Sequence, residues 1–404
     1  MTRQFIMGVG VLLLLVGVLS AQTWTPQNSN TTVQLRGLFM INDQEGWACG
    51  DAGVVLHTVD GGQNWSMVAL TAADLHEVTF KDAQTGIIVG DAGTILRTTD
   101  GGATWNFVNS ATTSQLRGAD WGDGDVVWAA GRDGAVVKSM DAGATWMALN
   151  SGTTERLRAI SAVGTDHAWV VGNNGVIRHT ADGGMTWTAQ SSVATGNLQD
   201  VQFLSPTVGF ACGSGSLVLY TNDGGNTWVS RSAGIAVGQN GLYFLDENTG
   251  WSVGGGGTIY ATTDAGMTWM LQASGVAEDL NEVFFPSSQK GWIVGNNGVI
   301  LHFQAPTGVE PPQTLPASPM LEQNYPNPFN PSTTIRFHLP AAGQVTLTVY
   351  SITGQPVATL IAGKRFAAGA HEVVFEAADL ASGVYFYELT TGSTRQIRRM
   401  ILLR

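Results

Sequence analysis

The sequence repeats one nine-residue phrase six times. The copies read HTVDGGQNW, RTTDGGATW, KSMDAGATW, HTADGGMTW, YTNDGGNTW and ATTDAGMTW. Their final residues are Trp65, Trp105, Trp146, Trp187, Trp228 and Trp269, so the spacing is 40 residues once and 41 residues thereafter. A fixed period of this length is typical of repeat proteins, in which each repeat is one structural unit. We therefore interpret the chain as an array of similar units.

Each repeat has the pattern of four short strands. An opening strand such as LNEVFFPSS is followed by a second strand that ends in a tight turn, such as GWACGDAG. A third strand such as VVLHT then leads into the tryptophan phrase, and a short fourth strand follows it. Short β-branched runs bounded by Gly, Asp and Asn are typical of antiparallel hairpins. Four strands in a period of about 41 residues predict the blade of a β-propeller.

The number of blades follows from the second-strand phrase, which occurs seven times. The seventh unit stops at GVILHFQ and lacks an outer strand. At the other end of the chain, TWTPQNS (23–29) matches TWTAQSS (186–192), which holds the fourth strand of the fourth unit. We therefore predict an all-β, seven-bladed β-propeller with four-stranded blades, in which the N-terminal strand closes blade seven. Such closure removes an exposed sheet edge.

The repeated phrase resembles the Asp box, S/T-x-D-x-G-x-T/N-W. In this pattern the Asp accepts backbone N–H bonds across a turn, and the second Gly adopts a positive φ at little cost. The Trp then buries a large ring between neighbouring sheets. Six carboxylates on six blades cannot converge on one substrate, and a catalytic group is expected once. We therefore interpret the phrase as structural.

The same alignment explains other residues that suggest chemistry. His57, His179 and His302 occupy one third-strand position, which we expect to face outward on separate blades and not to share a metal. The other blades have Arg97, Lys138, Tyr220 and Ala261 there. Cys49 and Cys212 belong to blades that are not neighbours, whereas a disulfide needs Cα atoms within about 7 Å. We expect two buried free thiols, no metal and no cofactor.

The opening strands supply a candidate binding site. Each begins with Leu, or with Gln239 in blade six, and the next residue is polar in every blade. These next residues are Arg36, His76, Arg117, Arg158, Gln199, Asn240 and Asn281. First strands line the central channel of a propeller, so we predict that the seven side chains, called here the mouth ring, surround one end of it.

The charge of the mouth ring suggests its ligand. Residues 22–320 contain 11 Lys and Arg against 26 Asp and Glu. This acidic body argues against nucleic acid or an anionic membrane as a partner. Three arginines on such a body create a local positive potential that suits a carboxylate, a sulfate or an acidic peptide. The alternative is that the ring residues are solvated strand ends, partly balanced by Glu77, Asp200 and Glu282.

Both termini carry segments outside the repeats. Residues 1–21 contain Arg3, the apolar run VGVLLLLVGVLS and small residues, which is the pattern of a secretory signal peptide. We expect no membrane-spanning segment after its removal. Five prolines between 306 and 319 indicate an extended linker, which we place at 305–320. Residues 321–404 alternate strands with turns and predict a small immunoglobulin-like β-sandwich.

Residues 22–304 resemble the photosystem II assembly/stability factor propellers. The phrase GWIVGNNGVILH and the repeated DGGxTW carry this resemblance. It implies a non-enzymatic assembly factor that binds partner proteins through an arginine patch. Arg36, Arg117 and Arg158 are the residues that map onto such a patch, whereas the other four blades have no Arg at this position.

The tail resembles the type A C-terminal sorting domain of the type IX secretion system. The motifs are YPNPFNPST, VYSITGQPV, LASGVYFYEL and the terminal RRMILLR. The resemblance implies a Gram-negative host, passage through the periplasm, contact of 321–404 with the secretion machinery, and release or attachment at the cell surface. A C-terminal adhesion or carbohydrate-binding sandwich is the alternative for this segment.

Together these features predict an exported, non-enzymatic propeller that acts as a protein-binding or assembly-type scaffold at the cell surface. The Asp box also resembles that of sialidases, so the alternative is a glycan-binding or glycoside-hydrolysing propeller. A sialidase needs an arginine triad and a Tyr nucleophile paired with a Glu. A purely structural surface component without a ligand site is a third possibility.

Overall fold

The structure, a computed structural model, describes residues 24–305, 319–324, 327, 329–340, 342–367, 369–377, 380–392 and 394–403. The chain divides into two compact units, Met1–Pro306 and Thr307–Arg404. The expected signal peptide (1–21) lies outside the described residues, as does most of the expected linker. No helix within the described ranges is long and apolar enough to cross a membrane.

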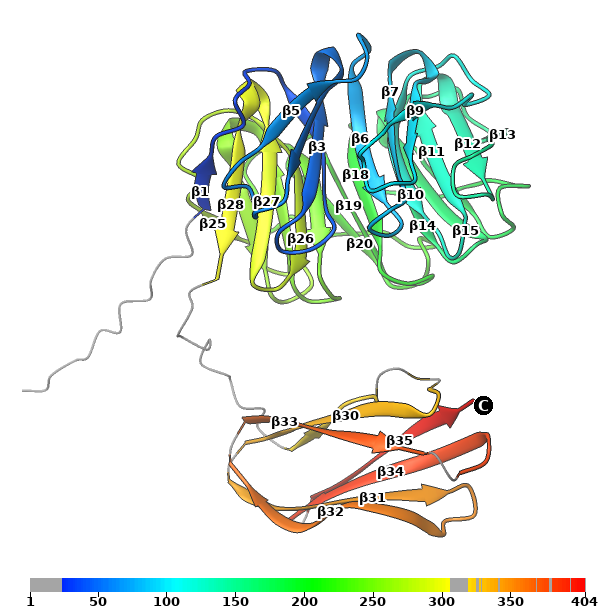
Figure 1. The fold of residues 1–404 in the computed structure, drawn as a ribbon, viewed down its shortest axis with the longest axis vertical. Coiled ribbons are helices and arrows are strands. Elements are labelled where there is room, and N and C mark those ends of the chain that lie inside the picture. Colours follow the sequence, from blue (N-terminus) through cyan, green and yellow to red (C-terminus); the bar gives the residue numbers. More distant parts are fainter. Residues whose placement is uncertain are drawn as a thin grey trace, which may run out of the picture. The chain divides into compact units, whose positions relative to one another are not determined.

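The first unit is an all-β, propeller-like assembly of four-stranded antiparallel sheets (Figure 1). Two sheets consist of β2 (Leu35–Met40), β3 (Gly46–Gly50), β4 (Val54–Thr58) and β5 (Ser66–Ala69), and of β6 (Leu75–Phe80), β7 (Gly86–Gly90), β8 (Ile95–Thr98) and β9 (Asn106–Phe107). The next two consist of β10 (Leu116–Trp121), β11 (Val127–Gly131), β12 (Ala135–Ser139) and β13 (Met147–Asn150), and of β14 (Leu157–Val163), β15 (His167–Gly172), β16 (Ile177–Thr180) and β17 (Thr188–Ala189).

Three further sheets complete this unit. The fifth sheet consists of β18 (Leu198–Phe203), β19 (Gly209–Gly213), β20 (Leu217–Thr221) and β21 (Val229–Ser230). The sixth consists of β22 (Gln239–Phe244), β23 (Gly250–Gly254), β24 (Ile259–Thr262) and β25 (Met270–Gln272). The seventh consists of β26 (Leu280–Ser287), β27 (Lys290–Gly295), β28 (Ile300–Gln304) and β1 (Trp24–Gln27). Short 3₁₀ turns follow the second strand in six sheets, namely η1 (Asp51–Gly53), η2 (Asp91–Gly93), η3 (Arg132–Gly134), η4 (Asn173–Gly175), η5 (Gly255–Gly257) and η6 (Asn296–Gly298).

The two ends of the first unit meet in one sheet. Strand β1 pairs with β28 in an antiparallel register that sets Trp24 opposite Phe303, so the pairing predicted from TWTPQNS is present (Figure 1). The Trp24 ring is 4% exposed and lies 5.4 Å from the Phe303 ring. Opening strands of consecutive sheets contact one another, and β26 contacts β2. The sheets therefore follow one another around a central axis lined by the opening strands.

The tryptophans of the Asp boxes pack between sheets, as predicted. Trp105 lies edge-on to Trp47 of the preceding sheet at 5.8 Å. Trp187 lies edge-on to Trp128 of its own preceding sheet at 6.1 Å. Trp65 shares a buried cluster with residues of the sheet that holds β1. Each indole therefore fills the space between two adjacent sheets.

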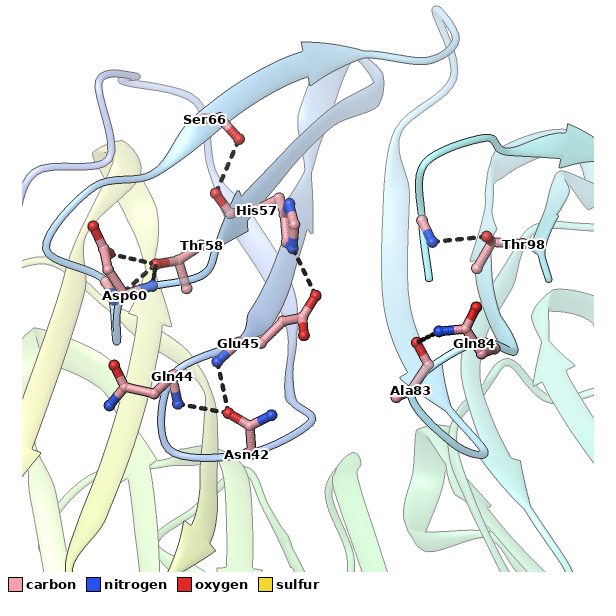
Figure 2. A network of polar contacts seen from close by, with 12 residues as sticks. Asn42, Gln44, Glu45, His57, Thr58, Asp60, Ser66, Ala83, Gln84 and Thr98 are labelled. Atoms are coloured by element: carbon pink, nitrogen blue, oxygen red, sulfur yellow. Dashed lines mark hydrogen bonds and ion pairs between the residues drawn. The ribbon is translucent and has the colours of Figure 1, made fainter. Parts of the chain in front are cut away.

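The polar residues of the Asp box bind the turn itself. In the first sheet, Asp60 Oδ1 accepts a hydrogen bond from Thr58 Oγ1 at 2.9 Å (Figure 2). It also accepts the Asn64 N–H at 2.9 Å. Thr58 Oγ1 in turn accepts the Gly62 N–H at 2.8 Å, and Gly62 has a φ of 81°. The other five boxes repeat this pattern at Asp100, Asp141, Asp182, Asp223 and Asp264. All six carboxylates are therefore occupied by their own turns.

The third-strand positions differ from the prediction that they face outward. His57 stacks on Trp47 with ring centroids 3.7 Å apart, and Figure 2 shows its Nε2 directed at Glu45, 3.3 Å away. Lys138 is 5% exposed, with its ammonium 4.2 Å above the Trp128 ring. The reason is the register, because in six sheets the third-strand residue lies directly opposite a second-strand aromatic residue on the same face, whereas Arg97 lies opposite Ile87. These side chains therefore cover the tryptophans.

Cys49 and Cys212 are free and buried, as expected from their separation in the repeat. Burial raises the pKa of both thiols well above its usual value. Within the described ranges, no group of three or more His, Cys, Asp or Glu side chains is placed to hold a metal ion.

The second unit has two antiparallel sheets. One has the order β29 (Met320–Leu321), β30 (Ser332–Leu339), β33 (Gly369–Glu376), and the other has the order β32 (Pro356–Phe366), β31 (Gly343–Ser351), β34 (Gly383–Thr391), β35 (Thr394–Leu402). Phe337 from the first sheet and Leu347 and Tyr387 from the second belong to one buried cluster. The two sheets therefore share a core.

Candidate functional site

The structure brings all seven residues of the mouth ring to one cavity. This cavity, called here the mouth cavity, has a volume of about 280 Å³. The ring residues that line it are Arg36, His76, Arg117, Arg158, Gln199, Asn240 and Asn281. One residue comes from each of the seven opening strands, so the common cavity reflects the order of the sheets. The binding role of the ring stays a prediction.

A β-bulge places each ring residue. In the first sheet, Leu35 lies opposite Gly50 and Gly37 lies opposite Cys49, so Arg36 is an extra residue between two paired positions. The same shift occurs at the ring position of the other six opening strands. A bulge leaves one residue outside the ladder and redirects its side chain. The ring positions can be predicted from the sequence repeat, whereas the bulges that form them cannot.

Two of the three arginines are held by the turn that follows the second strand of their own sheet. Arg36 Nε donates to Asp51 Oδ1 at 2.7 Å. Arg158 Nε donates to Asn173 Oδ1 at 2.8 Å, and its Nη1 donates to Gln199 Oε1 at 2.8 Å. In both cases the acceptor stands 15 residues after the arginine. These two side chains are therefore fixed by neutral or acidic partners.

Arg117 differs because the residue 15 positions later is Arg132. A second arginine cannot accept a hydrogen bond, and within the described residues no hydrogen bond or ion pair joins the Arg117 guanidinium to another group. Burial, followed by repulsion from Arg158 and Arg36, lowers the pKa of Arg117 to about 10. The side chain is half-buried and still charged at neutral pH. Its N–H donors are therefore available to an anion in the mouth cavity.

His76 adds an unsatisfied buried atom beside Arg117. Its side chain is 4% exposed, and its Nε2 lies 2.7 Å from Asp91 Oδ1. Its Nδ1 is buried without a hydrogen-bond partner among the described residues. Burial is the main cause that lowers the pKa of His76 to about 4, so the ring is neutral at pH 7. Nε2 is thus held by Asp91, while Nδ1 has no partner among the described residues.

The two asparagines of the ring have structural bonds. Asn240 Nδ2 donates to the Leu280 carbonyl at 2.9 Å, and Asn281 Nδ2 donates to the Leu35 carbonyl at 2.6 Å. Each bond joins the opening strands of adjacent sheets. This side of the mouth cavity is therefore rigid and includes the carboxylate Asp279, in contrast to the side that carries Arg117.

Glu77, Asp200 and Glu282 are the carboxylates that the alternative interpretation of the mouth ring sets against the arginines. All three line the mouth cavity, yet no ion pair among the described residues joins them to an arginine. Asp200 instead accepts the N–H groups of Val201 and Leu242 at 2.7 and 2.9 Å. Burial is the first cause that raises the pKa of all three carboxyls. The arginines therefore have no acidic partner from within the channel.

A second cavity, called here the inner cavity, continues the channel. Its volume is about 340 Å³, and it shares Glu77, Asp200 and Glu282 with the mouth cavity. Its other lining residues include a set three positions after the ring, which are Phe39, Thr79, Asp120, Ser161, Gln202, Tyr243 and Phe284. Three residues of a strand span about 10 Å. The channel thus has a basic mouth, an acidic layer and an aromatic interior.

Comparison with known families identifies the first unit. The family described as photosynthesis system II assembly factor YCF48 matches residues 71–202 and 233–304, which make up just over half of the chain. The chain belongs to the YCF48 family. The match covers most of the opening strands that carry the mouth ring. A second family, described as secretion system C-terminal sorting domain, matches residues 323–403. The chain therefore joins a YCF48-family propeller to a sorting domain for secretion.

Solved structures of the YCF48 family share this fold. The structure of YCF48 bound to D1 peptide is 22% identical with a TM-score of 0.61, and the alignment covers 71% of this chain and 99% of that one. YCF48 from Cyanidioschyzon merolae is 21% identical, with a TM-score of 0.60 and coverage of 71% and 100%. The WD40 propeller domain of Doa1 is 11% identical, with a TM-score of 0.60 and coverage of 70% and 98%. A search of curated proteins found no match.

The geometry of Tyr243 bears on the sialidase alternative. Sialidases use a Tyr nucleophile activated by a Glu. Tyr243 lines the inner cavity with Glu77 and Glu282, but no hydrogen bond joins its phenol to either carboxylate in the described chain. Burial raises the pKa of Tyr243 to about 12. A raised pKa makes a phenol a weaker nucleophile at neutral pH, so this side chain is poorly suited to the sialidase reaction.

Proposed function

We propose that this protein is an exported, non-enzymatic scaffold that binds an acidic segment of a partner protein at the mouth cavity. Arg117 carries the proposal, because it is the mouth arginine without an acceptor in the described chain. A guanidinium in a partly dehydrated cavity binds a carboxylate through two parallel hydrogen bonds. Arg36 and Arg158 add positive potential while their own acceptors hold them in place.

A peptide complex within the same family supports a protein ligand. In one solved structure of this fold, YCF48 is bound to D1 peptide. Since identity to that relative is 22%, the likeness concerns the fold, and the ligand of this chain is argued from its own mouth cavity. We infer a peptide with an exposed carboxylate, either a side chain of Asp or Glu or a free C-terminus.

The proposal includes a specific arrangement of the chain. We infer that the seven four-stranded sheets of residues 22–304 are the blades of one closed ring. We further infer that residues 321–404 form an immunoglobulin-like sandwich. Because this segment matches the sorting-domain family, we infer that it directs export by the type IX system of a Gram-negative bacterium. The propeller would then function at the cell surface or after release.

The test is a titration of the exported protein with a fluorescent hexa-glutamate peptide, measured by anisotropy at low salt. Charged hydrogen bonds of this kind contribute about 1.5–3 kcal/mol, so Arg117→Gln should weaken binding by about tenfold to hundredfold. Arg97→Gln is the matched control, because it removes one positive charge from β8, the third strand of its sheet, outside the lining of both cavities. It should change affinity by less than about twofold.

Two results would overturn the proposal. One is equal binding of the peptide by the wild type and by Arg117→Gln, which would remove the mouth cavity from the interaction. The other is steady turnover of a fluorogenic sialoside that exceeds the rate in buffer, which would favour the glycosidase alternative. Circular dichroism of each variant establishes that the fold is intact.

A further inference from the structure

The inner cavity combines aromatic side chains with buried carboxylates. The ring of Phe284 lies 4.8 Å from that of Phe39 and 4.9 Å from that of Tyr243. The indole N–H of Trp121 is buried without a hydrogen-bond partner among the described residues. Phe39, Tyr243 and Phe284 thus form an aromatic part of the lining of this cavity, which also includes Trp121.

The same cavity has several carboxylates and no lining cation. Glu77, Asp120, Asp200 and Glu282 line it, while no Lys or Arg among the described residues does. Asp120 and Asp200 each accept two backbone N–H bonds, and in both pairs one donor comes from the next sheet. Glu77 and Glu282 each accept one N–H bond, at 3.1 Å, from the residue that follows them. These two glutamates therefore retain acceptor capacity toward the cavity.

We propose that the inner cavity binds a guanidinium group on an aliphatic stem, the end of an arginine side chain from a partner. A planar guanidinium is weakly hydrated, stacks on aromatic faces and pairs with carboxylates through parallel N–H bonds. The site offers rings at Phe39, Tyr243 and Phe284 and free carboxylate oxygens at Glu77 and Glu282. A compact ammonium gains less from the flat ring faces and loses more hydration. This inference is independent of the anion site at Arg117.

Charge balance in the channel makes such binding depend on pH. Burial raises the pKa of Asp120 to about 7 and holds the pKa of Glu77 and Glu282 well above its usual value. A guanidinium stabilises the ionised carboxylates, so its binding releases protons and strengthens as the pH rises from 5 to 8. The charged or titratable groups that line the inner cavity are Glu77, Asp120, Asp200, Glu282 and Tyr243. Those at the mouth are Arg36, His76, Arg117, Arg158 and Asp279.

The test is calorimetric titration of the exported protein with N-acetylarginine methylamide. The citrulline analogue has the same shape without the charge and serves as the ligand control. The lysine analogue keeps the charge but has no planar guanidinium, so it tests whether the planar group is required. We expect the arginine probe to bind at least tenfold more tightly than the citrulline probe. Its apparent enthalpy should also depend on the buffer at pH 6.5, since protons are released. Equal binding of arginine and citrulline probes would overturn the proposal.

Variants separate this site from the mouth cavity. Glu77→Gln with Glu282→Gln should reduce binding of the arginine probe about tenfold or more and abolish the proton release, while both side chains keep their size. Phe39→Leu removes one aromatic ring from the cavity and should weaken binding of the arginine probe several-fold. Arg117→Gln should retain binding of the arginine probe but weaken binding of hexa-glutamate. Retention of the arginine probe by the double variant, with unchanged proton release, would refute the assignment.

Discussion

Single residues decide which side chains of the mouth ring are free. Arg36 and Arg117 occupy equivalent bulges, yet Arg36 is bound by Asp51 whereas Arg117 faces a turn that carries Arg132. The chemical difference between the two sites therefore originates 15 residues away in the sequence. His76 follows the same rule, because its acceptor Asp91 stands at the equivalent turn position.

The Asp box provides a prediction for one buried hydroxyl. Thr180 is 1% exposed, and its Oγ1 accepts the Gly184 N–H at 2.9 Å while it donates to Asp182. Thr180→Val keeps the shape but leaves a buried N–H without a partner. We expect the free energy of unfolding to fall by about 1–3 kcal/mol, measured by urea denaturation. Thr188→Val, which removes an exposed hydroxyl that does not contact Asp182, is the control, and an equal loss in both variants would contradict the account.

At the scale of elements, the N-terminal strand completes the last sheet. Strand β1 covers the edge of β28, and Trp24 fills the space between the sheet of β22–β25 and its own sheet. Its indole N–H also donates to Gln272 at 2.8 Å. The four residues of β1 therefore cover the edge of β28, a strand that lies nearly 280 residues further along the chain.

This closure predicts a large effect of one substitution near the N-terminus. Truncation of a buried Trp costs about 3–5 kcal/mol, so Trp24→Ala should lower the free energy of unfolding by that amount. Thr25→Ala, on an exposed side chain of the same strand, should cost less than about 1 kcal/mol. Denaturation followed by fluorescence measures both. Equal stability of Trp24→Ala and the wild type would show that β1 does not contribute to closure.

Much of this architecture could be predicted from the repeat, because the period fixes the strands and the in-phase residues. The mouth ring was found because its members follow the first buried position of each opening strand. Two features were missed. The bulges change the register without a change in residue type, and the acceptors lie in a different element. A comparison of positions 36 and 51 with 117 and 132 would have revealed the acceptors.

At the scale of the whole molecule, the ring of sheets concentrates carboxylates in its channel, and this predicts the pH dependence of stability. The pKa of Asp120 is raised to about 7 in the folded state, so its stabilising contribution is complete below pH 4 and is lost as the pH rises through 7. The pKa of Asp141 and Asp182 is held at about 2, mainly by hydrogen bonds from Thr145 and Thr186. The Asp boxes thus contribute little change in the free energy of unfolding above pH 5.

We therefore expect the free energy of unfolding to decrease from pH 6.5 to pH 8, above the range in which the buried neutral His76 and His179 contribute the opposite slope. A pKa difference of one between the folded and unfolded states corresponds to about 1.4 kcal/mol, so a loss of a few kcal/mol is expected. The double variant Glu77→Gln with Glu282→Gln should flatten this dependence. Urea denaturation at both pH values measures it. A stability that rises with pH, or an unchanged slope in the double variant, would contradict the assignment of buried, uncompensated carboxylates.

The most direct test of the central claim leaves Arg117 in place and gives it an acceptor. Arg132→Asn introduces at the turn the residue type that binds Arg158 in its own sheet. The measurement is the affinity for hexa-glutamate of this variant beside the wild type and Arg97→Gln. We predict that Arg132→Asn weakens binding at least fivefold, beyond the effect of the one charge removed in Arg97→Gln. Equal affinity in the two variants would show that a free Arg117 guanidinium is not what binds the acidic ligand.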